Sequence, residues 1–215
     1  MKIIDLTHTI EENMPVYPGT ECPGLETANT HERNGFKETL ITMLSHTGTH
    51  IDPPAHLVKN GATLDSFEID SFVGSAIVID CRHLNEGEPI TMTELAPYSD
   101  SLNKVDFLLF NIGWDKKWGS NDYFGDYPCV SDEVLELVIQ GNYKGIGFDV
   151  IGLDPIGDAS LSRHNKLFKA KNIINIENLK NLDKCGNKPF EFICLPLKIK
   201  DSDGAPARAI AIFED

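Results

Sequence analysis

Short apolar runs rich in β-branched residues recur along the whole chain, and each run is bounded by Gly, Pro, Asn or Asp. Runs of this length with such boundaries are typical of β-strands. The pattern predicts strands at residues 2–6, 39–44, 75–80, 105–110, 145–150, 172–176, 192–199 and 207–213.

Helical patterns are fewer. Residues 131–140 are predicted as a helix, because Ser131 can cap its start and apolar residues three and four positions apart form a stripe that ends before Gly141. Thr91 and Glu94 have the spacing of a capping box, which predicts a second, shorter helix. Since strands outnumber helices, the pattern alone indicates a mixed α/β domain.

Chemically reactive side chains are densest in one eleven-residue segment, HTGTHIDPPAH, which contains His46, His50, Asp52 and His56. Imidazole nitrogens and carboxylate oxygens are ligands that zinc and its first-row neighbours favour. A straight strand would hold His46 and His50 ~13 Å apart, too far to share one ion. The chain must therefore bend between them, and Gly48 permits the bend. We interpret the segment as the bent end of a strand that runs into a rigid turn, with a metal at the bend.

Composition narrows the class of protein. The chain has 215 residues and is expected to form one domain, residues 1–215. Its 19 basic and 33 acidic residues give a formal charge of −14, which argues against nucleic acid or an anionic membrane as a partner. The five cysteines are scattered and odd in number, so a reducing cytoplasm is expected. No apolar stretch approaches the ~20 residues of a membrane span, and the first residues do not resemble a signal peptide.

The eleven-residue segment resembles the His-x-Gly-Thr-His-x-Asp-x-Pro-x-His signature of the bacterial kynurenine formamidase group, which lies within the cyclase family of metal-dependent hydrolases. Every fixed position of the signature is matched. The similarity extends over most of the chain, through the stretches IDLTH, PVYPG, FLLFNIGW, GFD and DGAPAR. The resemblance implies a three-layer β/β/α architecture of the swivelling type.

The resemblance also implies a ligand set. His46, His50 and Asp52 correspond to metal ligands of the family, and a distal histidine and glutamate of the family map to His164 and Glu177. Because Asp52 has two oxygens, it can bridge a second ion. One or two zinc ions are therefore expected, with manganese as an alternative, since nitrogen and carboxylate ligands suit both metals.

His56 is not assigned to the metal. Two prolines separate it from Asp52 and hold it near the site with its imidazole free. With an ordinary pKa near ~6.5, a histidine can take up and return a proton at neutral pH. We expect His56 to be catalytic and to protonate the leaving amine.

Tyr17 marks a departure from the family pattern. Formamidases have a Trp-Pro-Gly-Asp stretch whose tryptophan packs on the aromatic ring of the substrate, whereas residues 17–20 here are Tyr-Pro-Gly-Thr. Tyrosine can still stack on a substrate, but with a smaller ring. Residues 111–114, Asn-Ile-Gly-Trp, replace a more usual Arg-Thr-Gly-Trp.

These departures leave alternatives open. The expected activity is that of an arylformamidase, which converts N-formylkynurenine to kynurenine and formate in tryptophan catabolism. Hydrolysis of a cyclic amide such as isatin, of a lactone or of an ester is the alternative on the same metal site. A catalytically silent metabolite-binding protein is a further alternative.

The family resemblance also implies a homo-oligomer, a dimer or a tetramer. In some family members the neighbouring subunit's N-terminal region completes the pocket, and residues 6–18 are the candidate for such an arm. Elsewhere, His8 is expected to be structural, His31 and His83 to be exposed, and Asp149 and Asp154 to cap loops and orient other groups.

Overall fold

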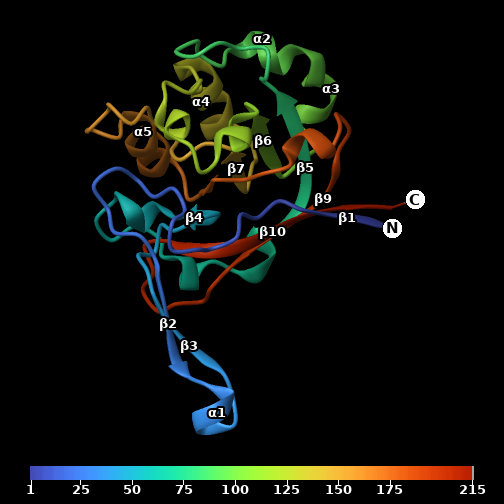
Figure 1. Cartoon of the computed structure of the whole chain (residues 1–215). Coiled ribbons are helices and arrows are strands. Elements are labelled where there is room, and N and C mark those ends of the chain that lie inside the picture. The colour runs from blue at the N-terminus through green and yellow to red at the C-terminus, as the bar shows by residue number, and fades with distance from the viewer. Residues whose placement is uncertain (215) are drawn as a thin grey trace.

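Within residues 1–214, which the computed structural model describes, seven strands form a closed ring (Figure 1). The order around the ring is β10 (Ala205–Phe213), β4 (His50–Asp52), β8 (Ile174–Glu177), β7 (Gly145–Phe148), β6 (Phe107–Asn111), β5 (Val73–Asp80) and β9 (Phe190–Pro196). The ring closes because β9 also pairs with β10. Strands β5 to β8 are parallel, and β1 (Lys2–Asp5) lies antiparallel to β10.

The parallel strands separate two apolar cores. Alternate residues point to opposite faces of a strand. On β5 and β6, Ile77 and Phe110 pack in the core beneath the helices, whereas Val78 and Leu109 pack in the core inside the ring. Because both faces are buried, these strands are continuous apolar runs rather than alternating ones. The helices, the parallel strands β5 to β8 and the strands on the other side of the ring form three layers. This agrees with the expected three-layer β/β/α architecture.

The strand predictions are largely confirmed. The predicted strands correspond to β1, β5, β6, β7, β8, β9 and β10, with ends that differ by up to a few residues. The predicted strand at 39–44 is β3 (Glu38–Thr42), but it pairs only with β2 (Gly24–Asn29) in a separate hairpin. The pattern missed β2, because its sequence, GLETAN, has a single large apolar residue.

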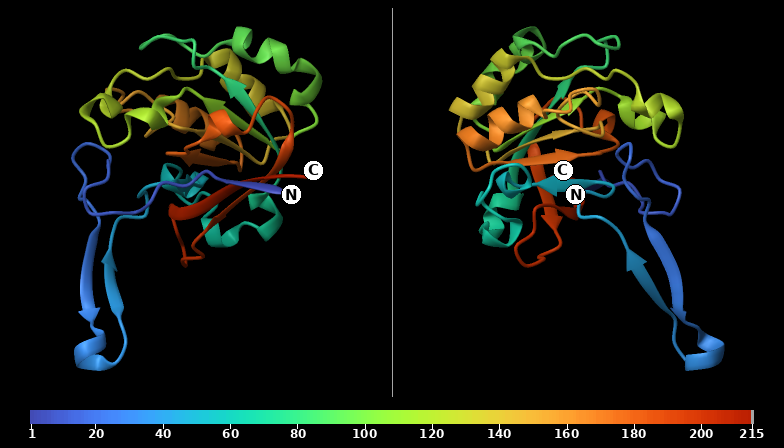
Figure 2. Two further views of the ribbon diagram at one scale, coloured as in Figure 1. Left: turned by 45° about the vertical axis from the view of Figure 1, so that its right-hand side comes forward. Right: turned by 90° about the vertical axis from the view of Figure 1, so that its left-hand side faces the viewer.

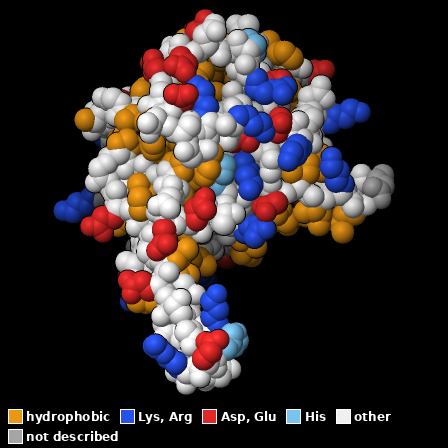
Figure 3. Space-filling view, viewed as in Figure 1, with side chains coloured by type: hydrophobic (Ala, Val, Ile, Leu, Met, Phe, Trp, Pro, Cys, Tyr) orange, Lys and Arg blue, Asp and Glu red, His pale blue; other side chains and the backbone are white. Residues whose placement is uncertain are grey.

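This hairpin is an arm, residues 24–42, that projects from the body of the molecule (Figure 2). The short helix α1 (His31–Asn34) forms its tip, where Figure 3 shows basic, acidic and histidine side chains together. The hypothesis that residues 6–18 complete a neighbouring subunit's pocket stays a prediction, and Leu6 and Met14 of that segment are buried in the single chain. Apolar contacts within the same chain therefore hold residues 6–18 in place.

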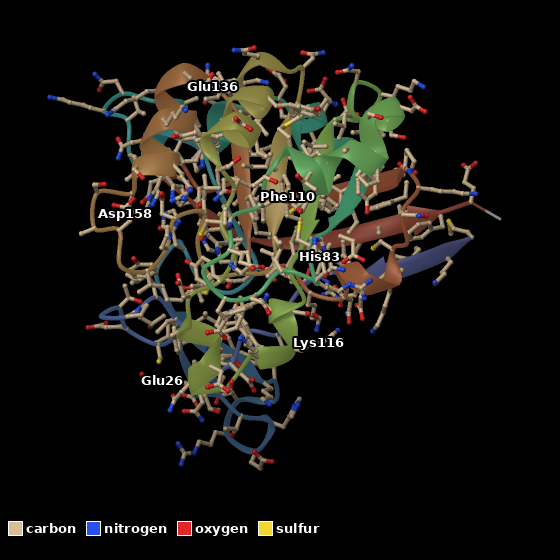
Figure 4. The ribbon with its side chains drawn as sticks, turned by 90° about the horizontal axis from the view of Figure 1, so that it is seen from above. Glu26, His83, Phe110, Lys116, Glu136 and Asp158 are labelled. Carbon is tan, nitrogen blue, oxygen red and sulfur yellow. The ribbon has the colours of Figure 1, made fainter. Side chains whose placement is uncertain are left out.

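Helices α2 (Met92–Leu95), α3 (Ser99–Leu102), α4 (Asp132–Gln140) and α5 (Ser162–Ala170) cover one side of the parallel strands. Ser131 caps α4 and the capping box of Thr91 and Glu94 begins α2, as predicted. The pattern missed α5, which the carboxylate of Asp158 helps to begin by accepting the backbone N–H of Ser162. In Figure 4, Asp158 lies at the periphery and Phe110 near the middle of the molecule.

Short 3₁₀ turns occupy Pro54–His56, Leu64–Ser66, Ile69–Phe72, Ala96–Tyr98, Trp114–Lys117, Asn121–Phe124 and Leu182–Lys184. Among the residues that the structure describes, no helix has both the length and the apolar character that crossing a membrane requires.

Candidate metal centre

The chain bends at Gly48, as its sequence predicts. Gly48 has a φ of +64°, a left-handed conformation that costs side-chain-bearing residues free energy. β4 begins two residues later at His50, and a 3₁₀ turn that starts at Pro54 ends at His56. The bend brings the ring centroids of His46 and His50 to 5.2 Å, and those of His46 and His56 to 4.0 Å.

The pairing register of β4 and β8 places Glu177 beside the residues of the eleven-residue segment. β4 and β8 are antiparallel, with His50 opposite Glu177 and Asp52 opposite Asn175. Directly opposite residues project on the same face of a sheet. The first turn of α5 then places His164 beside them, with its Nε2 atom 3.1 Å from Glu177 Oε1. Three separate segments of the chain thus converge on one point.

Two groups of ligand atoms share Asp52. His46, His50 and Asp52 form the first group, and Asp52, His164 and Glu177 form the second. Asp52 Oδ1 lies 2.7 Å from His46 Nδ1 and 3.1 Å from His50 Nε2. Asp52 Oδ2 lies 3.6 Å from His164 Nε2. The two oxygens of one carboxylate therefore face two neighbouring positions for a cation.

The second nitrogens of two histidines have fixed partners. His50 Nδ1 donates to the carbonyl oxygen of Gly48 at 2.8 Å, and His164 Nδ1 donates to Asp154 Oδ2 at 2.6 Å. Both Nε2 atoms consequently face the cluster, the arrangement found around metal-binding histidines. Asp154 thus has the orienting role expected from the sequence.

The charges at this point fit a cation. Burial lowers the pKa of His50, but the Asp52 and Glu177 carboxylates outweigh burial and raise it to about 9. Burial also lowers the pKa of His164. Its hydrogen bond to Asp154 is the largest of the interactions that outweigh burial and raise this pKa well above the ordinary value. Burial raises the pKa of Asp52, yet the His50 and His46 imidazoles hold it well below its usual range. The buried carboxylates therefore stabilise positive charge, which a divalent cation would supply.

His56 has different surroundings. It is half-buried, and its ring centroid lies 6.0 Å from that of His164. Burial lowers the pKa of His56, and the nearby Asp52 carboxylate offsets only part of this effect. His56 also lies close enough to His46 and the exposed Asp203 for the three to form a third group of ligand type.

Every residue that the sequence predicts for the site lines one cavity. The cavity has a volume of about 660 Å³, and Tyr17 lies in its wall with its hydroxyl 3.4 Å from the carbonyl oxygen of Ile156, to which it donates. Apolar side chains such as Leu44 and Ile151 also line it. The nominated residues are Tyr17, His46, His50, Asp52, His56, His164 and Glu177.

Sequence reasoning missed two buried asparagines. Asn175 lies between Asp52 and Glu177, and its position two residues before Glu177 was a signal, since alternate strand residues share a face. Asn178 has a φ of +56° and donates from Nδ2 to the carbonyl oxygen of Gly48 at 2.8 Å. No pattern in the sequence indicates the contact between Asn178 and Gly48.

Other expectations are confirmed by the structure. His8 is buried, and its ring stacks on Trp118 at 3.8 Å between centroids, away from the cavity lining. His31 and His83 are exposed. Asp149 caps a loop by accepting the backbone N–H groups of residues 112, 113 and 114.

Comparisons with known proteins agree with the geometry. The model of the family described as "Putative cyclase" matches residues 4–155. A kynurenine formamidase from Bacillus thuringiensis subsp. konkukian (strain 97-27) is 31% identical over 208 residues, which are 96% of this chain and 95% of that protein.

Two solved structures have the same fold. Isatin hydrolase A from Labrenzia aggregata, bound to benzyl benzoate, matches with a TM-score of 0.86 and 28% identity over 98% of this chain and 93% of that one. A structure described as a predicted metal-dependent hydrolase from Bacillus stearothermophilus matches with a TM-score of 0.79 and 29% identity, over 98% and 97% of the two chains. The resemblance carried by the eleven-residue segment is thereby confirmed, and the chain belongs to the cyclase family.

Proposed function

We propose that this protein is a metal-dependent hydrolase that cleaves a carbon–nitrogen bond in an aromatic formamide or cyclic amide. The observation that carries the proposal is the convergence of five ligand-type side chains at the base of one cavity, with His56 beside them. The relatives described as kynurenine formamidase and isatin hydrolase support amide chemistry.

His46, His50 and Asp52 would hold one cation, and Asp52, His164 and Glu177 would hold a second. Nitrogen and carboxylate ligands suit zinc, which we propose as the native metal, with manganese as the alternative. A divalent cation bound there would polarise the amide carbonyl and lower the pKa of water. Asp154 and the Gly48 carbonyl keep the imidazoles of His164 and His50 turned toward these positions.

His56 moves the proton in this proposal. Because its pKa is lowered, the imidazole is neutral at neutral pH and can accept a proton from the attacking water. The imidazolium then returns that proton to the nitrogen of the leaving amine, which prevents recombination with the acyl group. A protein that only binds a metabolite would have no use for this proton carrier.

We propose N-formylkynurenine as the substrate. The walls offered by Tyr17, Leu44 and Ile151 can receive its aromatic ring. A cyclic amide of the isatin type is the second candidate, favoured by the fold likeness to isatin hydrolase A and by tyrosine at position 17. Lactones and esters are further candidates for the same site.

The test is turnover of N-formylkynurenine and of isatin by the purified protein. We expect hydrolysis of at least one of them, its loss on removal of metal, and its recovery with zinc or manganese. Turnover that persists after complete metal removal would contradict the proposal. Bound metal with no turnover of formamides, cyclic amides, lactones or esters would favour a binding protein instead.

We also propose that the protein is a homo-oligomer, a dimer or a tetramer, in which the arm packs on a second copy. Leu40 and Ile41 are 54% and 55% exposed, and as neighbours in β3 they point to opposite faces of the arm. A two-stranded hairpin by itself is marginally stable in water, so a second copy that covers these faces would stabilise it. We further propose that the chain forms a single domain. We also propose a cytoplasmic location, because the cysteines are free and a reducing compartment keeps thiols free.

A further inference from the structure

Asn175 lies at the centre of the candidate metal centre, although no ligand motif includes it. It is fully buried in β8, directly opposite Asp52 and two residues before Glu177. Its side chain therefore projects on the same face of the sheet as His50, Asp52 and Glu177. These four residues are the corners of a polar patch on β4 and β8.

The amide nitrogen of Asn175 is surrounded by acceptors. Nδ2 lies 3.0 Å from Asp52 Oδ2, 2.8 Å from Glu177 Oε1 and 3.3 Å from His164 Nε2. An amide nitrogen has two hydrogens, which the carboxylate oxygens of Asp52 and Glu177 can accept. The other end of the same amide, Oδ1, is buried without a hydrogen-bond partner, which is costly in a protein interior.

The spacing of these atoms is that of ligands around one ion. The distances from Nδ2 to the three acceptors run from 2.8 to 3.3 Å, and His164 Nε2 lies 3.1 Å from Glu177 Oε1 and 3.6 Å from Asp52 Oδ2. Four ligands at ~2.0–2.1 Å from a tetrahedral zinc ion are about 3.3 Å apart. The amide end of Asn175 therefore lies at a ligand-to-ligand distance from one atom each of Asp52, His164 and Glu177, the three side chains that could hold one ion.

We propose that Asn175 is a further ligand of the cation held by Asp52, His164 and Glu177, through its amide oxygen. A half-turn of the amide exchanges Oδ1 for Nδ2, because the two ends have nearly the same shape. With the amide turned the other way, its nitrogen lies within hydrogen-bond distance of the carboxylates of Asp52 and Glu177. This inference rests on the metal centre of the proposed function and not on its substrate.

The test is calorimetric titration of Co²⁺ into metal-free protein, for wild type, Asn175→Leu and Asn175→Asp. Leucine has a similar volume but no oxygen, so we expect it to weaken one Co²⁺ binding step at least tenfold. Aspartate retains the oxygen and adds charge, so we expect affinity at or above that of wild type. Asn111→Leu, in an equally buried strand position away from the cavity, controls for the loss of a buried amide.

His50→Ala separates failure of this inference from failure of the metal centre. If His50→Ala loses Co²⁺ binding while Asn175→Leu binds as wild type does, the inference about Asn175 is overturned and the centre stands. If wild type and His50→Ala bind alike, the centre itself is overturned. Weakened binding in both Asn175 variants would show that the amide nitrogen matters and not the oxygen, which also overturns the proposal.

Discussion

At the scale of single residues, His56 and His164 show how surroundings decide the chemistry of an imidazole. His164 is buried between the carboxylates of Asp154 and Glu177, and its pKa is raised. His56 is half-buried at the cavity wall, and its pKa is lowered, chiefly by burial. The first arrangement suits a group that holds a cation, and the second suits a group that exchanges protons.

This contrast predicts the phenotype of His56→Gln. Glutamine can form hydrogen bonds but cannot carry the proton, so we expect kcat to fall by about 10²–10⁴-fold. Metal content, measured by elemental analysis, should remain that of wild type. His83→Gln, at a histidine whose side chain is 63% exposed, is the matched control and should be fully active. Full activity in His56→Gln with metal bound would exclude the proton-transfer role.

His8 predicts how stability depends on pH. Burial lowers the pKa of His8 to about 4, and Lys180 and Lys116 act in the same direction against the opposing Asp115. The unfolded chain therefore binds the proton first, and stability is lost as the pH falls from about 6.5 toward 4. The shift corresponds to about 3 kcal/mol at 1.36 kcal/mol per pH unit.

His8→Phe should abolish this contribution, because phenylalanine can stack on Trp118 without titrating. Urea unfolding of wild type and variant at pH 7.5 and pH 4 measures it. The difference in unfolding free energy between the two proteins should change by about 3 kcal/mol in favour of the variant at pH 4. An identical difference at both pH values would show that His8 does not protonate on unfolding.

The clustering of His46, His50 and Asp52 could be predicted from residue types and spacing, because they lie within seven positions of one another. Residues 164 and 177 were accessible only through family resemblance. A lone histidine and a lone glutamate otherwise suggest a solvated surface. Asn175 was missed because an amide has no ligand spacing of its own, and only strand register places it opposite Asp52.

At the scale of elements, the bend before β4 depends on Gly48. The Asn178 side chain stabilises the positive φ of Gly48, because it donates a hydrogen bond to the Gly48 carbonyl oxygen. That same carbonyl accepts from His50 Nδ1, so the shape of the bend also sets the orientation of the His50 imidazole. Backbone conformation and metal site are thereby coupled at one residue.

Gly48→Ala should therefore weaken both stability and metal binding. A left-handed alanine costs about 1–2 kcal/mol, and its Cβ would lie 3.2 Å from Met14 Cε. Thermal unfolding with and without metal, together with metal titration, measures the two effects. Gly24→Ala, where a Cβ meets only Thr42 Cβ at 3.9 Å, is the control. Unchanged metal affinity in Gly48→Ala would show that the bend does not set the site.

Elements with both faces buried were the most predictable, because β5 to β8 are continuous apolar runs between two cores. Helix α5 was not predicted, because its sequence, SRHNKLFKA, is mostly polar and its first turn depends on Asp154 and Asp158 in the preceding loop. The hairpin partner β2 has too few apolar residues to show a strand pattern.

At the scale of the whole molecule, the arm projects from the body and carries exposed apolar side chains. The tip of the arm is charged, while Phe36, Leu40 and Ile41 along it are about half exposed. Large apolar side chains gathered on a projecting segment are typical of an interface. The sequence predicts an oligomer through family resemblance, and it names residues 6–18 as the candidate arm; the projecting hairpin at residues 24–42 could not be predicted, because β2 has too few apolar residues.

Sedimentation velocity, which measures the oligomeric state, tests whether the arm packs on a second copy. Wild type should sediment as a dimer or tetramer, and the double variant Leu40→Glu, Ile41→Glu should shift toward the monomer with an unchanged far-ultraviolet spectrum. Lys104→Glu changes an exposed charge outside the arm and should leave the assembly intact. A monomeric wild type would contradict the proposed assembly.

We propose that five side chains from three segments hold one or two divalent cations in the cavity. Anomalous diffraction from zinc-loaded crystals, recorded on both sides of the zinc absorption edge, tests this proposal. We expect a peak within about 2.0–2.2 Å of ligand atoms of His50 and Asp52, and a second beside His164 and Glu177. Well-ordered crystals of fully loaded protein with no peak among these residues would contradict it.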